Sequence, residues 1–161
     1  MNASAFLPRS ESKVVFVVVM VCYATFASRF LQAIEIAFGL PVPPIGTFLG
    51  HRSPAFEFVA LVLAPLIESF FLIGIIELLR WLRLPAWLLV ACSAVIFAFL
   101  DGSLSIQRAF VIAPGWVIMS IAYVMWRRVS WKIGFVIVAS IHAFLNSLAA
   151  IVTIGYVFRH N

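Results

Sequence analysis

The chain has 161 residues, of which 65% are hydrophobic and 11% are charged, and its mean hydropathy is +1.15. An ordinary soluble domain is about 45–50% apolar and about 25% charged, so this composition excludes a soluble globular protein. Sixteen Phe spread along the chain and only two Cys also exclude a disordered chain and a disulfide-stapled scaffold. The net charge of +5 does not indicate nucleic-acid binding, because the basic residues stand in ones and twos between apolar stretches, as they do at membrane surfaces. The sequence therefore predicts an all-α, polytopic membrane helix bundle in contact with the lipid bilayer.

The first predicted helix covers residues 14–38 and follows a short polar tail, residues 1–13. Its apolar character continues too far for a signal peptide, and no good cleavage site is present, so we expect an anchoring helix. Its second half carries a polar stripe at helical spacing, formed by Thr25, Ser28, Arg29, Gln32 and Glu35. We expect this stripe to lie at the membrane interface, with Arg29 extended toward water, and the alternative is a buried ligand site.

A proline-rich segment follows the first helix and cannot continue it, because proline removes backbone donors and restricts its neighbours. We expect this loop to reach about residue 54. Four further spans are predicted at residues 55–79, 85–100, 110–126 and 133–158. The whole chain is thus expected to form one integral membrane domain of about five spans, in which residues 54–158 form a four-helix core.

The basic residues between these spans are distributed unequally. Seven fall on the amino-terminal side of the predicted bundle: Arg9, Lys13, Arg80, Arg83, Arg127, Arg128 and Lys132. Three fall on the opposite side: Arg52, Arg108 and Arg159. Because cytoplasmic loops carry the excess of Lys and Arg, this predicts a cytoplasmic amino terminus and a carboxyl terminus outside.

Polar residues inside the predicted spans are the functional candidates. An ionisable group at the centre of a span costs about 2.5–3.5 kcal/mol on the insertion scale, so such groups face the bundle interior. Glu68 lies in the middle of the second span, Asp101 closes the third, and His142 lies near the middle of the fifth. Asn146 follows His142 by four residues and so shares its helix face.

Two features flank Glu68. Pro65 removes one backbone hydrogen bond and predicts a bend one turn before Glu68. Glu77 is nine residues after Glu68, on the opposite helix face, and is expected to pair with Arg80 or Arg83 in solvent at the rim.

Each candidate also has a purely structural interpretation. His142 alone would be a hydrogen-bonded core histidine, Asn146 a contact between helices, and Asp101 a cap of the following loop. Glu68 has no such interpretation, because it lies about 18 Å from either end of its predicted helix, beyond the reach of a side chain extended to the interface. The occurrence of all four on three helices favours a shared polar cavity.

These residues resemble the CAAX-protease and bacteriocin-processing enzyme family (CPBP, also called Abi), membrane-embedded peptidases with the motifs EExxxR, FxxxH and HxxxN. Residues 142–146, His-Ala-Phe-Leu-Asn, match the third motif, and residues 97–101 match the second except that aspartate replaces histidine. In the first motif Glu68 is the first glutamate, while Ser69 and Ile73 replace the second glutamate and the arginine. The order and the spacing of the three motifs agree with the family.

The resemblance implies Glu68 as the general base and His142 with Asn146 as oxyanion donors. Asp101 departs from this pattern, because an ionised carboxylate lacks the N–H donor of the family's histidine. The departures point to a non-catalytic relative that binds or scaffolds a membrane partner. The alternative is an atypical intramembrane endopeptidase of the glutamic type that cleaves a membrane-anchored peptide.

Other chemistries are open to the same residues. Glu68 and Asp101 could share one proton and activate water as an aspartic dyad does. Together with His142 they could bind zinc, although they lack the spacing of ligand pairs. A rhomboid-type serine protease would need a Gly-x-Ser motif, which is absent from the sequence, and neither Cys22 nor Cys92 has a basic residue within one turn, as a cysteine transpeptidase would need. No cofactor is predicted, and a small transporter subunit is the remaining class.

Overall fold

The computed structural model describes residues 12–39, 59–101 and 106–160, and within these residues the regular structure is entirely helical. The elements are α1 (Lys13–Ala37), η2 (Val59–Leu63), α3 (Ala64–Trp81), α4 (Ala86–Asp101), α5 (Ile106–Trp126) and α6 (Trp131–His160), of which η2 is a short π-helix. Four of these segments, α1, η2 with α3, α5 and α6, are long and apolar enough to cross a membrane, and α4 is a shorter apolar helix. The predicted all-α membrane bundle is confirmed.

The helices begin and end close to the predicted positions. The largest difference is at α5, which begins at Ile106 rather than at residue 110. The start of the second span, predicted at residue 55, lies outside the described residues, where the helix is seen from Val59 onward. At α1, the Ser12 side chain accepts a hydrogen bond from the backbone N–H of Val15 at 3.4 Å, and Gly39 takes a positive φ of 68° beyond its last turn.

The irregularity expected before Glu68 takes the form of the π-helix. Pro65 lies in the first turn of α3, directly after η2. Proline has no backbone N–H, and inside a helix its ring clashes with the carbonyl four residues earlier. A π-helical turn has a wider hydrogen-bonded ring and so accommodates the proline without ending the helix. Glu68 therefore follows a turn whose backbone departs from regular α-helix.

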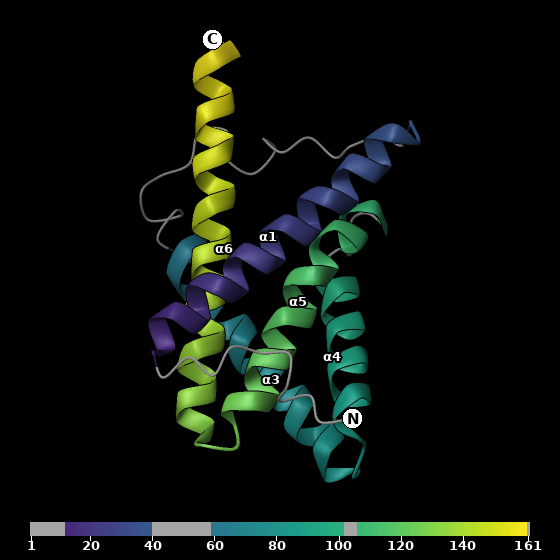
Figure 1. Cartoon of the computed structure of the whole chain (residues 1–161), viewed down its shortest axis with the longest axis vertical. Coiled ribbons are helices and arrows are strands. Elements are labelled where there is room, and N and C mark those ends of the chain that lie inside the picture. The colour runs from purple at the N-terminus through teal and green to yellow at the C-terminus, as the bar shows by residue number, and fades with distance from the viewer. Residues whose placement is uncertain (1–11, 40–58, 102–105, 161) are drawn as a thin grey trace.

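Helix α5 lies at the centre of the bundle and packs against α1, α3, α4 and α6 (Figure 1). In Figure 1, α1 runs diagonally in front of α5 and α6, while α4 lies alongside α5. The core between the helices is apolar and aromatic, and its most deeply buried large side chains are Phe16, Met20, Leu72, Ile76, Tyr123 and Ile141. Aromatic rings from different helices are in contact. The Phe97 ring lies 4.6 Å from that of Trp116, and the Phe16 ring lies 5.5 Å from that of Trp126, measured between centroids.

A buried hydroxyl pair joins α4 to α5. Ser93 Oγ lies 2.6 Å from the Leu89 carbonyl oxygen and 2.9 Å from Ser120 Oγ. A hydroxyl carries a single proton, so when Ser93 donates to Leu89 it accepts from Ser120. Both serines are fully buried, and this arrangement satisfies their polar atoms between two helices that carry few other polar groups.

Candidate functional site

The structure brings Glu68 of α3 and His142 of α6 together. The Oε2 atom of Glu68 lies 3.4 Å from Nε2 of His142. The two partners differ in exposure, because the His142 side chain is only 6% exposed while that of Glu68 is 41% exposed. The His142 ring meets Trp116 edge to face, with ring centroids 5.0 Å apart. The pair therefore has a buried half fixed in the core and an open half at the surface of α3.

The surroundings of His142 favour a neutral imidazole. Its Nδ1 atom is buried and has no hydrogen-bond partner among the described residues. A protonated ring would carry a second N–H donor at this atom, and burying such a donor without an acceptor is unfavourable. The arrangement thus favours the tautomer that directs Nε2–H toward Glu68, whose carboxylate is the acceptor.

The other two predicted site residues are less fully described. Asn146 lies one turn after His142 on α6 and is partly buried. Asp101 is the last residue of α4, but its side chain lies outside the described part of the structure. The shared-proton pair and the zinc site, which both require Asp101, stay predictions. Among the described residues, no three side chains of His, Cys, Asp or Glu gather in the manner of a metal site.

The positions where this chain departs from the family motif are buried. Ser69 is 0% exposed and Ile73 is 8% exposed, and both lie on the side of α3 that faces the core. Ile73 belongs to the main apolar cluster, and Ser69 Oγ has no hydrogen-bond partner within the described part of the chain. The interior next to Glu68 therefore holds an apolar side chain and a small hydroxyl at these positions, and neither of the two is charged.

A second polar cluster joins α3 to α5. Glu77 Oε1 accepts hydrogen bonds of 2.6 Å from the Tyr123 hydroxyl and from Arg127 Nε. The expected contact with Arg80 is present as well, at 3.5 Å from Oε2, but it is the longer of the two ion pairs. The hydrogen bond to Glu77 raises the pKa of Arg127, which lies just beyond the last residue of α5, above its ordinary value. The prediction that Glu77 pairs locally in solvent was therefore incomplete. In the sequence, the main partners of Glu77 are indicated only by the spacing of Tyr123 and Arg127, which lie four residues apart and so share one helix face.

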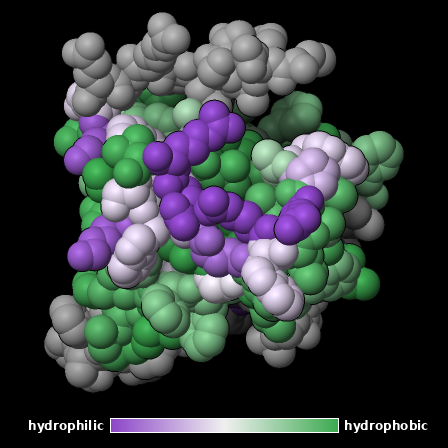
Figure 2. All heavy atoms as spheres, turned by 90° about the horizontal axis from the view of Figure 1, so that it is seen from below, coloured by the Kyte–Doolittle hydropathy of each residue, from purple (hydrophilic) through white to green (hydrophobic). Residues whose placement is uncertain are grey.

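Basic side chains gather at the end of the bundle that holds this cluster. Figure 2 looks at the molecule from below and shows a hydrophilic band crossing a largely hydrophobic surface. The contacts and helix boundaries place six basic residues at this end: Arg80 and Arg127 both pair with Glu77, Arg83 and Arg128 follow the ends of α3 and α5, and Lys13 and Lys132 line one groove. We call this the basic end. These six are the residues of the larger predicted basic set that fall within the described ranges.

The polar stripe of α1 divides into an exposed and a buried part. Arg29 is exposed and donates a 2.8 Å hydrogen bond to Gln32, as an interfacial stripe requires. Glu35, however, is only 3% exposed, and its Oε2 has no hydrogen-bond partner within the described residues. Glu35 follows the buried Ala24 by three helical turns and so lies on the packed face of α1, where the burial matches the alternative of a buried group and not an exposed stripe.

Comparisons with protein-family models, with curated proteins and with solved structures each find no match to this chain. The functional roles of Glu68, Asp101, His142 and Asn146 stay predictions.

Proposed function

We propose that this chain is a CPBP/Abi-like integral membrane protein that binds a partner segment within the membrane at Glu68 and does not cleave it. The observation that carries this proposal is the 41% exposure of the Glu68 side chain within the apolar span Leu61–Trp81. Its neighbours Ile67 and Phe71 are also exposed, and they present apolar surface to the surroundings. A membrane segment that carries a hydrogen-bond donor contacts both the exposed part of this carboxylate and the apolar side chains beside it, which supports a binding role for this face.

The uncharged residues Ser69 and Ile73 beside Glu68 support a non-catalytic role. The resemblance assigns the second glutamate and the arginine of the first motif to placing the substrate. Ser69 and Ile73 occupy these positions, and their burial means that neither side chain reaches a substrate at the open side of Glu68. His142 directs Nε2 toward Glu68, so it is engaged by the carboxylate and not held ready for an oxyanion.

An atypical endopeptidase is the second candidate, and the 3.4 Å approach of Glu68 Oε2 to His142 Nε2 favours it. A histidine that donates to a carboxylate fixes the orientation of that carboxylate, as a general base requires. In this mechanism Glu68 takes a proton from water as the water oxygen attacks the scissile carbonyl of a membrane-anchored peptide, and it gives this proton to the amine that leaves when the C–N bond breaks.

We also propose that the basic end faces the cytoplasm, with the carboxyl terminus outside. Basic residues from the ends of four helices lie together at this end, which supports this orientation, since positive residues are retained on the cytoplasmic side.

Photo-cross-linking in native membranes tests the binding role. A photoreactive residue in place of Phe71, which lies three residues after Glu68 on nearly the same face, should give one discrete cross-linked product. Phe99, an equally exposed side chain of α4, is the control position and should give none. Glu68→Leu should remove the product, and Glu68→Gln should retain it because the amide still forms hydrogen bonds.

Two results would reject the non-catalytic proposal. Identical cross-linking at Phe71 and Phe99, or none at either, would argue against a binding face at Glu68. Cleavage of a membrane-anchored peptide by the purified protein, lost in Glu68→Gln, would establish the endopeptidase in its place.

A further inference from the structure

An apolar groove lies between the first turns of α1 and the first half of α6. Its volume is about 410 Å³, within the range of small-ligand sites. The floor consists of the buried side chains of Val17 and Ile137, where the two helices touch. The walls consist of exposed apolar side chains that project from both helices: Val14, Val18, Val136 and Phe144. Apart from the Ser140 hydroxyl and two lysines, the lining offers hydrocarbon contact.

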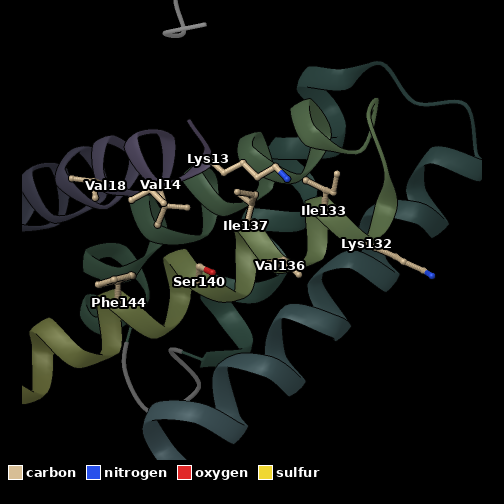
Figure 3. A pocket seen from close by; sticks show the side chains of 10 residues that line it. Lys13, Val14, Val18, Lys132, Ile133, Val136, Ile137, Ser140 and Phe144 are labelled. Atoms are coloured by element: carbon tan, nitrogen blue, oxygen red, sulfur yellow. The ribbon is translucent and has the colours of Figure 1, made fainter. Parts of the chain in front are cut away.

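The two lysines mark one end of the groove. Figure 3 shows Lys13 extending from α1 over the groove toward Ile133 of α6, while Lys132 points away from it. The Lys132 ammonium lies 6.0 Å from the ring centroid of Trp131, a half-exposed tryptophan of the kind found at the level of lipid headgroups. Both lysines are among the residues that line the groove, and the four-carbon stem of Lys132 is flexible.

The charges of these lysines are uncompensated within the described residues. Neither Lys13 nor Lys132 forms an ion pair there, whereas Arg80 and Arg127 at the same end are held by Glu77. The open end of the groove therefore has two positive charges that complement an anionic headgroup.

The length of the groove matches one leaflet of a membrane. From Lys132 to Phe144 the helix advances twelve residues, or about 18 Å. Half of the hydrocarbon core of a bilayer is about 15 Å thick. A chain that starts at the headgroup level thus reaches the far end of the groove near the bilayer centre.

We propose that this groove binds an anionic phospholipid, with its phosphate between Lys13 and Lys132 and one acyl chain along α1 and α6. The hydrocarbon lining and the leaflet length match an acyl chain, and the two lysines, which form no ion pair within the described residues, match the phosphate of the same molecule. A free anion would use the lysines but leave the apolar walls exposed, and an apolar helix would leave the lysines without a partner.

Native mass spectrometry of the full chain tests this proposal. The probes are phosphatidylglycerol and phosphatidylcholine with identical acyl chains, added to the protein in detergent. The wild type should bind phosphatidylglycerol more tightly. The double variant Lys13→Gln/Lys132→Gln should weaken this binding roughly tenfold to thirtyfold and remove the preference between the two lipids. Val136→Trp, which fills the groove, should weaken the binding of both lipids.

The matched control is Arg83→Gln/Arg128→Gln, which removes the same charge at the same end from residues that do not line the groove. It should retain the lipid preference, and all variants should keep the melting temperature of the lipid-free wild type. The proposal is overturned if the control loses the preference as fully as the lysine variant does, or if Val136→Trp binds both lipids like the wild type. Equal binding of the two lipids by the wild type would overturn it as well.

Discussion

The close contact of Gly134 with Tyr123 predicts that Gly134→Ala destabilises the bundle. A Cβ atom at this position would lie 2.9 Å from Cδ2 and 3.0 Å from Cε2 of Tyr123. The ring has little freedom to move, because Tyr123 is 1% exposed and its hydroxyl holds Glu77 at 2.6 Å. Overpacking of this kind costs about 1–3 kcal/mol, and the better helix propensity of alanine recovers about 1 kcal/mol. We expect a net loss of about 0–2 kcal/mol, with a central value near 1 kcal/mol, and a melting temperature lower by up to roughly 8 °C.

Unfolding in detergent, followed by tryptophan fluorescence, measures this loss. Gly74→Ala is the matched control, because a Cβ there meets nothing within 4 Å, and its melting temperature should stay equal or rise. Tyr123→Leu removes the obstructing ring atoms, so Gly134→Ala should cost much less in that background. If Gly134→Ala is as stable as Gly74→Ala, or costs the same with and without the tyrosine ring, the proposed role of this contact is refuted.

Three further outcomes are expected. A reporter active only outside the cytoplasm should be active when fused after Asn161 and silent when fused near Leu82, and the reverse pattern would reject the proposed orientation. Glu77→Gln should lower the melting temperature measurably, because it weakens short hydrogen bonds from α5. Arg80→Gln should change the melting temperature little, because an exposed ion pair at 3.5 Å contributes under about 1 kcal/mol. Equal shifts in the two variants would contradict this ranking. Asp101→His restores the second family motif and should add at most weak cleavage of a membrane-anchored peptide. Vigorous cleavage by this variant would show that Asp101 alone accounts for the lack of activity.

The fold could be predicted because a long apolar run between polar loops is typical of a membrane helix, and few other structures can satisfy its backbone groups in lipid. The same reasoning identified Glu68 and His142 as residues that do not belong in lipid, and the structure places them 3.4 Å apart. Whether they carry out chemistry does not follow from proximity. That question depends on Asp101 and on a partner or substrate that the sequence does not name.

The rotation of each helix about its axis was harder to predict. The polar neighbours of Glu35 favour an exposed stripe, whereas its position three turns after Ala24 lies on the packed face of α1. The bonds from Tyr123 and Arg127 to Glu77 join residues 46 and 50 positions apart in the chain. Local spacing shows that Tyr123 and Arg127 share one face of α5. Only the packing of α3 against α5 shows that this face meets Glu77.

The short length of α4 has a consequence for the surrounding lipid. Its apolar stretch, Ala86–Leu100, covers about 22 Å, whereas the hydrocarbon core of a typical bilayer is about 30 Å thick. A helix this short draws the headgroups toward it or tilts its longer neighbours, at a cost of a fraction of a kcal/mol for each ångström of mismatch. The bilayer is thus expected to be thinnest beside α4, and the protein should partition into thin membranes in preference to thick, sterol-rich ones.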